Sequence, residues 1–237
     1  MDRNDRILGV LGGMGPLASA HFMLRLTLLT PAIHDQDHIP AVLWSDPRVP
    51  DRTQATTGGA DPLPFLLRGI AGLRQAGCGA IAIPCNTAHG WYQQMQAAAG
   101  CPVLHIVDAA ADELQRLGVA SGTVGVMGTP ATLAMRLYQD RLGRAGWDCL
   151  IPSDDEMDRL VTPAIALVKA NRVAEAFAPL ATVARSLAER GAAAVVLGCT
   201  EIPLGLQAGP AQDRGVPLVD TIDALARASI AWARGSR

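Results

Sequence analysis

Two cysteines stand at corresponding places in two similar stretches of the sequence. Cys85 ends the apolar run of "AIAIPCNTAHG", and Cys199 ends that of "AVVLGCTEIP". Inverting a carbon acid requires a base on one face and an acid on the other, and a thiolate paired with a thiol supplies both. A free thiol has a pKa of about 8.5, so we expect a helix N-terminus after each cysteine to lower that pKa.

Polar residues follow both of these cysteines directly. Asn86 and Thr87 come after Cys85, and Thr200 comes after Cys199. Such side chains cap helices, and they also hydrogen-bond small ligands, so both roles stay open. The other cysteines are expected to be buried, unreactive packing: Cys78, Cys101 and Cys149.

Three further polar residues lie near the same points. His89 lies one helical turn beyond Cys85, where it either tunes the thiol or is a buried, hydrogen-bonded histidine. Asp108 and Asp220 follow matching apolar runs. We interpret these two carboxylates as structural hydrogen-bond acceptors rather than bases.

The elements that must position these residues follow an alternating pattern. Continuous apolar strands separated by helices predict parallel sheets covered on both faces. The predicted strands are 7–11, 41–45, 79–84, 102–107, 123–127, 147–151, 192–198 and 216–219. The predicted helices include 17–29, 61–76, 130–145, 155–170 and 173–190.

The landmarks recur in the same order in both halves of the chain. A glycine-rich loop follows strand 7–11, and "GTPAT" follows strand 123–127; a cysteine then follows a later strand in each half at nearly the same distance. This repeat predicts an α/β fold of two similar domains, each a parallel sheet flanked by helices, related by pseudo-two-fold symmetry. Because such sheets bind ligands beyond the carboxyl ends of their strands, we expect the two cysteines to approach one cleft from opposite sides.

The predicted domain boundaries follow from this repeat. An N-terminal domain covers 1–117 and a C-terminal domain covers 118–220, with the junction near 116–122. We expect the last helix, within 221–237, to pack back on the N-terminal domain.

Composition excludes several classes of protein. The chain has 237 residues, 49% of them hydrophobic, and a formal net charge of −2, so it can bury a core and has no basic surplus for nucleic acid or an anionic membrane. Its 5 cysteines match no zinc or disulfide framework, so we expect no metal. Neither a signal peptide nor a membrane-spanning stretch is visible, which predicts a cytoplasmic protein.

The chain contains the motifs "GVLGGMGPLAS" (9–19), "PDRT" (50–53), "PCNTAH" (84–89) and "GCTE" (198–201). These four motifs resemble the aspartate/glutamate racemase superfamily, and most closely its aspartate racemase branch. The resemblance spans nearly the whole chain and keeps the family's order of motifs. It implies a homodimer of two-domain subunits that uses Cys85 and Cys199 as catalytic residues, without pyridoxal phosphate or metal. Glutamate racemases usually carry a histidine after the second Cys-Thr, and Glu201 stands there instead, which favours the aspartate-like branch.

The resemblance also implies substrate-binding residues. The backbone of Gly13 and Met14 would meet the α-carboxylate, although a tight turn alone explains a glycine-rich loop that lacks the dinucleotide and P-loop spacings. Arg52 would bind the side-chain carboxylate, with Arg48 as a competitor in the same loop. Lys169, the only lysine in the chain, would be a second carboxylate contact.

Five more residues complete the implied substrate site. Asn86, Thr87 and Thr200 would hydrogen-bond the substrate carboxylate or amine, and Thr129 would do so from the loop after strand 123–127. Glu201 would meet the substrate ammonium, or it would simply add negative charge at a helix start.

The sequence therefore predicts an amino-acid racemase, independent of pyridoxal phosphate, that interconverts L- and D-aspartate by two-base proton transfer at the α-carbon. Glutamate stays open as a substrate. The alternatives are a related two-thiol isomerase, decarboxylase or hydantoin racemase acting on another small acid, or a non-catalytic acid-binding protein. Retention of both cysteines speaks against the last, since a binder needs no acid–base pair.

Overall fold

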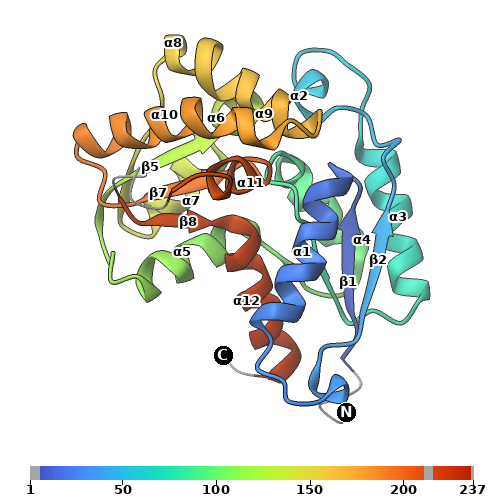
Figure 1. Cartoon of the computed structure of the whole chain (residues 1–237). Helices are drawn as coiled ribbons and strands as arrows, with labels where there is room; N and C mark the ends of the chain where they lie inside the picture. The colour runs from blue at the N-terminus through green and yellow to red at the C-terminus, as the bar shows by residue number, and fades with distance from the viewer. Residues whose placement is uncertain (1–5, 211–215, 236–237) are drawn as a thin grey trace. The chain divides into compact units, whose positions relative to one another are not determined.

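The strands of the chain form two parallel sheets, each flanked by helices (Figure 1). The strand orders of the two sheets are equivalent. The computed structural model describes residues 6–210 and 216–235. It divides into a first unit, which runs to Ala109 and resumes at Ile222, and a second unit, Ala110–Thr221. The sequence analysis placed the junction at 116–122. The predicted domain ranges also include residues 1–5, 211–215 and 236–237, which lie outside the described residues.

The sheet of the first unit has the order β2-β1-β3-β4. Leu8 of β1 pairs with Ala41 on one side and Ala80 on the other. Every residue of β1 is buried, whereas the edge strand β2 is only partly so, which is why the central strand carries the continuous apolar run. The strands are β1 (Leu8–Gly12), β2 (Ala41–Ser45), β3 (Ala80–Ala82) and β4 (Val103–Leu104).

Helices cover both faces of this first sheet. Gly12 and Leu43 face α1 beside Ser19, whereas Trp44 packs against Gly69 of α3. Consecutive strand residues therefore supply opposite faces. The elements are α1 (Pro16–Leu29), η2 (Asp35–Asp37), α2 (Arg52–Ala55), α3 (Leu63–Gln75), η3 (Thr87–Trp91), α4 (Tyr92–Ala99), α5 (Ile106–Arg116), which crosses into the second unit, and α12 (Thr221–Arg234).

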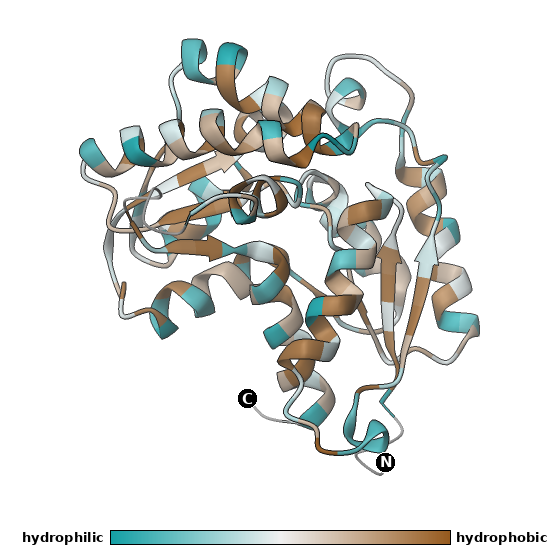
Figure 2. Cartoon of the chain, in the orientation of Figure 1, coloured by the Kyte–Doolittle hydropathy of each residue, from teal (hydrophilic) through white to brown (hydrophobic). Residues whose placement is uncertain are grey.

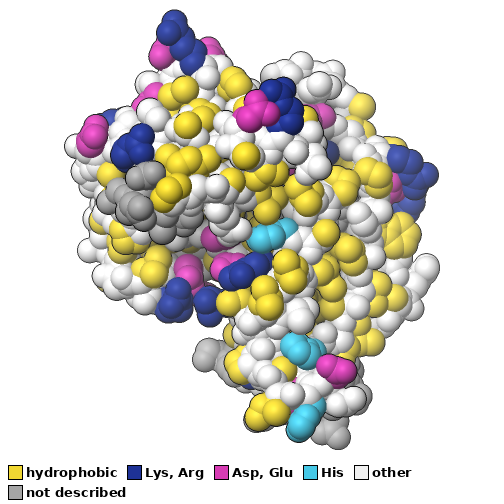
Figure 3. All heavy atoms as spheres, in the orientation of Figure 1, with side chains coloured by type: hydrophobic (Ala, Val, Ile, Leu, Met, Phe, Trp, Pro, Cys, Tyr) yellow, Lys and Arg dark blue, Asp and Glu magenta, His cyan; other side chains and the backbone are white. Residues whose placement is uncertain are grey.

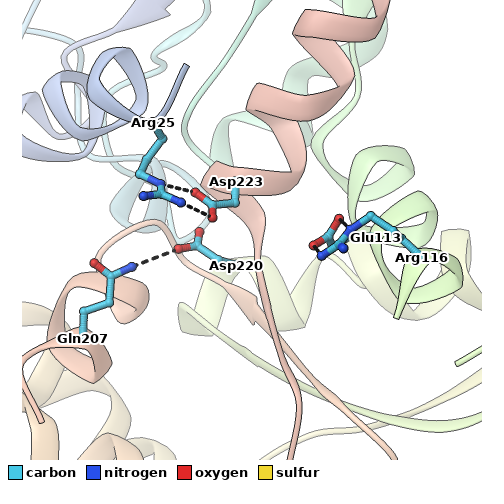
Figure 4. Close-up of polar contacts among 6 residues, drawn as sticks. All are labelled: Arg25, Glu113, Arg116, Gln207, Asp220 and Asp223. Carbon is cyan, nitrogen blue, oxygen red and sulfur yellow. Dashed lines mark hydrogen bonds and ion pairs between the residues drawn. The ribbon is translucent and has the colours of Figure 1, made fainter. Parts of the chain in front are cut away.

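The last helix, α12, belongs with the first unit. Arg25 of α1 and Asp223 of α12 form a bidentate ion pair, with Nε–Oδ1 and Nη2–Oδ2 distances of 2.5 and 2.7 Å (Figure 4). Trp232 of α12 packs against Gly79 just before β3. This helix therefore makes contacts with the beginning of the chain and not only with its sequence neighbours.

The sheet of the second unit has the order β6-β5-β7-β8. Leu187 of α10 packs over Gly125 of β5, and Tyr138 of α7 packs over Gly198 of β7, so helices again cover both faces. The strands are β5 (Gly122–Gly128), β6 (Trp147–Leu150), β7 (Val195–Gly198) and β8 (Leu218–Asp220). The helices are α6 (Pro130–Ala134), α7 (Leu137–Arg144), α8 (Asp154–Glu156), the π-helical η4 (Met157–Val161), α9 (Thr162–Lys169), η5 (Val173–Ala176), α10 (Phe177–Glu189) and α11 (Ile202–Gln207).

These two sheets confirm the predicted fold class of two similar α/β halves, each with a parallel sheet flanked by helices. Hydropathy follows the same arrangement, since the strands at the centre of each half are brown in Figure 2 and much of the outer helical surface is teal. Charged side chains of both signs are interspersed on the face shown in Figure 3. Within the described ranges, no helix is both long and apolar enough to cross a membrane.

Two predicted elements are wrong in part. Strand 102–107 ends at Leu104, because Ile106 and Val107 begin helix α5 instead. Helix 130–145 is interrupted between α6 and α7, where Arg136 adopts a left-handed backbone with φ 54°. The first error arises because a short apolar run favours strand and helix alike.

Candidate active site

The candidate residues of the first unit follow the carboxyl ends of neighbouring parallel strands. Gly13 and Met14 follow β1, Arg52 begins the short helix after β2, and Cys85 comes three residues after the end of β3. Because parallel strands end at the same edge of a sheet, these loops gather at one edge of the first sheet.

The Cys85 thiol lies at this edge and is nearly buried, with 5% of the residue exposed. The His89 ring is held by two backbone groups. Its Nδ1 is 2.9 Å from the Cys85 carbonyl oxygen, and the Ile106 N–H donates to its Nε2 at 3.2 Å. Since Nε2 accepts, Nδ1 carries the proton and donates to the carbonyl. Both ring nitrogens of His89 thus serve the backbone, which favours the buried, hydrogen-bonded interpretation over direct tuning of the thiol.

The residues after Cys85 do not cap a helix in the expected way. Asn86 and Thr87 are both buried and begin the 3₁₀ turn η3, but Asn86, its N-cap, makes no side-chain cap hydrogen bond. The capping prediction is therefore wrong for Asn86. The 3₁₀ turn tightens the chain directly after Cys85, so both residues belong to the same short segment as the thiol.

The glycine-rich loop after β1 is held by contacts within the first unit. The Gly13 N–H donates to Ser19 Oγ at 2.9 Å, and Ser19 Oγ donates to the Gly15 carbonyl at 2.8 Å. Gly13 has φ +91°, and a Cβ there would lie 2.4 Å from the backbone carbonyl carbon of Asp46. The Gly13 N–H is thus already used inside the loop, and Ser19, which the sequence analysis did not single out, fixes it.

The two competing arginines have different surroundings. Arg48 is 74% exposed at its side chain and pairs with Asp46 through Nε–Oδ1 (2.8 Å) and Nη2–Oδ2 (2.9 Å). This pairing lowers the pKa of the Asp46 carboxyl to about 2. Arg52 instead anchors Nη1 on the carbonyls of Val49 (3.2 Å) and Pro50 (3.0 Å).

The Nε side of the Arg52 guanidinium has no such anchor. Its Nε is buried and has no hydrogen-bond partner among the described residues. Such an orphaned donor is unfavourable unless a ligand satisfies it. The Nε–Nη2 edge has the geometry that binds a carboxylate through two parallel hydrogen bonds, so Arg52 is the better placed of the two arginines for this task.

In the second unit, Thr129 follows β5 and caps α6. Its Oγ1 accepts from the Thr132 N–H at 3.1 Å and lies 2.9 Å from the Thr132 hydroxyl oxygen. Lys169 ends α9, which follows the π-helical turn η4 and packs on α11. The Lys169 side chain is exposed, and its positive charge lowers the pKa of the Cys199 thiol.

The Cys199 thiol lies directly after β7 and is 4% exposed. Its Sγ donates to Glu201 Oε2 at 3.1 Å, and the Thr200 hydroxyl donates to the same oxygen at 3.3 Å. Thr200 is therefore a partner of Glu201 and not the predicted helix cap. Within the described chain, these three consecutive residues form one small hydrogen-bonded group.

The expected lowering of the cysteine pKa is wrong for Cys199. Burial raises the pKa of the thiol well above its ordinary value, and the Glu201 charge raises it further. The Glu201 N–H and Lys169 act in the opposite direction but do not prevail. The helix that follows, α11, has only six residues, so it offers little dipole to stabilise a thiolate.

The sequence analysis did not single out two further residues near Cys199, Tyr138 and Thr221. Tyr138 is fully buried against Gly198, and burial raises the pKa of its phenol, which stays neutral. Thr221 donates from Oγ1 to the Leu197 carbonyl at 2.8 Å and hydrogen-bonds the Tyr138 side chain. Only packing brings them together, since no local motif marks either residue.

Asp108 and Asp220 were interpreted as structural hydrogen-bond acceptors. Asp220 Oδ2 accepts from Gln207 Nε2 at 3.4 Å (Figure 4), and Asp108 lies in the first turn of α5.

Burial is the main cause that raises the pKa of the other three cysteine thiols, which keeps them protonated and unreactive at neutral pH. These are Cys78, Cys101 and Cys149, the last with a pKa of about 11.

Each half of the chain thus carries one nearly buried cysteine after the third strand of its sequence, β3 in one sheet and β7 in the other. The two sheets have equivalent strand orders, so the cysteines occupy equivalent positions in their units. A thiol in such a position is able to exchange a proton with a bound carbon acid.

Comparisons with known proteins agree with these observations. An aspartate racemase of Picrophilus torridus is 30% identical, with 98% of this chain and 95% of that one covered and a TM-score of 0.83. The broad specificity amino-acid racemase RacX of Bacillus subtilis is 25% identical over 94% of this chain and 96% of its own length. A glutamate racemase of Francisella tularensis, solved with D-glutamate, shares the fold at 19% identity, with 98% and 83% of the two chains covered and a TM-score of 0.70.

A model of one protein family, described as Asp/Glu/Hydantoin racemase, matches residues 11–229. That match includes both cysteine motifs and nearly the whole chain. The chain therefore belongs to the Asp/Glu/hydantoin racemase family and is an enzyme of the isomerase class.

Proposed function

We propose that this enzyme interconverts L- and D-aspartate without pyridoxal phosphate, using Cys85 and Cys199 as its two acid–base groups. The observation that carries the proposal is the equivalent placement of the two nearly buried thiols, each after the third strand of a like sheet. Inversion at the α-carbon needs one group on each face, and two equivalent half-sites provide such a pair.

In the proposed reaction, one cysteine thiolate removes the α-proton and the other cysteine thiol donates a proton to the opposite face. The planar intermediate carries its extra negative charge on the α-carboxylate. Hydrogen-bond donors around that carboxylate stabilise the charge as it develops. The residues proposed for this task are Met14, Asn86, Thr87 and Thr129.

Two positively charged side chains favour a substrate with an acidic side chain. The Nε–Nη2 edge of Arg52 is proposed to bind the side-chain carboxylate, since Nη1 is already anchored on backbone carbonyls. Lys169 adds a compact positive charge near Cys199. The aspartate racemase of Picrophilus torridus, 30% identical over nearly the whole chain, supports aspartate ahead of glutamate.

The decisive experiment follows the α-proton itself. We expect purified enzyme in D2O, without added cofactor, to exchange the Cα–H of L-aspartate and to form D-aspartate, as seen by NMR and chiral chromatography. L-glutamate and 5-substituted hydantoins are run in parallel, because the family model covers hydantoin racemases as well. Exchange on a hydantoin but on neither amino acid would replace aspartate as the substrate.

The two cysteines are tested by substitution. Cys85→Ala and Cys199→Ala should each lower racemisation by at least about 10²-fold, because each removes an acid–base group that the reaction needs in every turnover. Cys149→Ala is the matched control, since this thiol lies within the edge strand β6 and not in a loop that follows a strand, and it should leave turnover within about twofold. Ordinary turnover in both directions by either active-site variant would refute the two-base mechanism.

A homodimer is part of the same proposal. It rests on the family resemblance, and sedimentation of the purified protein measures it directly. A monomer with full racemase activity would remove the dimer from the proposal and leave the chemistry in place.

A further inference from the structure

Glu201 is buried beside Cys199, with only 5% of the residue exposed. One of its carboxylate oxygens, Oε2, accepts from the Cys199 thiol at 3.1 Å and from the Thr200 hydroxyl at 3.3 Å. Two donors on one oxygen fix the orientation of the carboxylate, and an acceptor in this position fixes the direction of the S–H bond. The side chain is thus engaged with the thiol, a contact that neither of the two roles left open by the sequence analysis included.

The two charged side chains near Cys199 have opposite effects on the ionisation of its thiol. Glu201 opposes formation of a thiolate, because two negative charges would then share one buried site. Lys169, at the end of α9, acts in the opposite direction, and Tyr138 of α7 is buried and neutral. Burial of the thiol is the largest cause that raises its pKa, and Glu201 adds to this effect, so the thiol form of Cys199 is favoured.

The equivalent position in the first unit carries no charge. Cys85 is followed by Asn86 and Thr87, so a neutral threonine stands two residues after this cysteine, where Glu201 stands two residues after Cys199. The two half-sites are therefore alike in fold and unlike in electrostatics.

We propose that Glu201 is a positioning residue that keeps Cys199 in its thiol form in the resting enzyme, so that Cys199 is the proton donor and Cys85 the base. This inference rests on the two-cysteine racemisation proposed above and gives the two thiols different starting states. It also replaces the expected contact between Glu201 and the substrate ammonium.

The proton balance of one turnover follows. The Cys85 thiolate forms an S–H bond with the α-proton of the substrate, while the S–H bond of Cys199 breaks as its proton reaches the opposite face of the carbon. The enzyme is left with a Cys85 thiol and a Cys199 thiolate beside Glu201. Turnover of the opposite enantiomer, or exchange of one proton with solvent at each thiol, restores the resting state.

Thiol titration without turnover tests the proposal. In Cys85→Ala protein, the rate at which iodoacetamide alkylates the Cys199 peptide is measured by mass spectrometry across a pH series. We expect the pH midpoint of this alkylation to lie above the pKa of a free thiol, which is about 8.5. Adding Glu201→Gln, which keeps the shape and removes the charge, should lower the midpoint by about one unit or more, so that alkylation below it becomes about tenfold faster.

Two further variants separate charge from shape. Glu201→Asp keeps the charge and should keep the midpoint high, whereas Glu189→Gln removes a charge from the exposed end of α10 and should leave the midpoint unchanged. A midpoint that Glu201→Gln does not move would overturn the proposal. A midpoint of the Cys85→Ala protein at or below that of a free thiol would overturn it too.

Kinetics provide a second readout in the protein with both cysteines. Glu201→Gln should move the alkaline limb of the pH profile of kcat/KM to lower pH, because that limb reports loss of the Cys199 proton in the free enzyme. A higher KM with an unmoved limb would assign Glu201 to the substrate ammonium instead. A lower Tm with an unmoved limb would assign it a structural role.

The two proposals fail separately in these experiments. Alkylation needs no substrate, so a Glu201-dependent midpoint in a protein that racemises nothing would refute the proposed function alone. Racemisation by the wild type with a Glu201-independent midpoint would refute the role of Glu201 alone.

Discussion

Arg48 and Arg52 lie four residues apart in one loop, yet their guanidinium groups have different partners. Arg48 is exposed and already paired with Asp46, whereas Arg52 is anchored through Nη1 and leaves its buried Nε without a partner among the described residues. A ligand carboxylate on Arg52 would satisfy a donor that the protein leaves open. The sequence alone ranked the two by resemblance, and hydrogen bonding now supplies a physical reason.

Arg52→Gln should raise the KM for aspartate by about 10–100-fold, which is the effect of losing a hydrogen-bonded charged contact. Arg48→Gln should change KM by less than about fivefold, since it disrupts only an exposed ion pair. Steady-state kinetics of both variants, with circular dichroism to confirm folding, provide the comparison. An equal or larger effect at Arg48 would assign the carboxylate to that residue.

The limits of prediction at the residue scale have a physical origin. The positions of Cys85 and Cys199 at strand ends could be predicted, because strands and their ends are visible as apolar runs followed by polar residues. The thiol–carboxylate contact of Cys199 and the Ser19 contact to Gly13 could not be predicted. They depend on side-chain rotamers and on burial, which no local spacing specifies.

At the scale of elements, the loop after β1 is shaped by the backbone of the loop after β2. Gly13 has φ +91°, and a Cβ on it would lie 2.4 Å from the carbonyl carbon of Asp46. The two loops therefore touch through backbone atoms alone, and only glycine permits this approach.

Gly13→Ala should destabilise the protein by about 3 kcal/mol or more, because it adds a steric clash to an unfavourable backbone conformation. Gly58→Ala is the matched control: Gly58 has φ +95°, but a Cβ there meets nothing within 4 Å. That control should lose only about 1–2 kcal/mol, the effect of backbone conformation alone. Urea denaturation measures both, and equal losses would contradict the role of the Asp46 contact.

Elements with a strong pattern were predicted well. Strand 41–45 coincides with β2, and helix 17–29 differs from α1 only at its first residue. The short helix α2 was not predicted, since four residues are too few to show a period. The break at Arg136 was also missed, because a left-handed backbone at arginine has no sequence signature.

At the scale of the whole molecule, the chain leaves its first unit after Ala109 and returns to it at Ile222. The ion pair between Arg25 and Asp223 joins two helices from opposite ends of the sequence. Its side chains are 26% and 20% exposed, so water screens the pair only in part.

A double-mutant cycle of Arg25→Gln and Asp223→Asn should give a coupling energy of about 1.5–3 kcal/mol in urea denaturation. The same cycle on Arg136 and Asp140, whose side chains are 64% and 53% exposed, should give about 0.5 kcal/mol or less. If the two cycles gave the same coupling, the pairing of α1 with α12 would contribute no more than a surface contact.

The return of α12 to the first unit also affects the order of folding during synthesis. Domains generally fold as units, the N-terminal one first, as the chain emerges from the ribosome. Here the first unit lacks α12 until Thr221–Arg234 has been made, while every residue of the second unit, Ala110–Thr221, precedes Ile222. The second unit is therefore complete in the growing chain before the first unit, which receives α12 only afterwards.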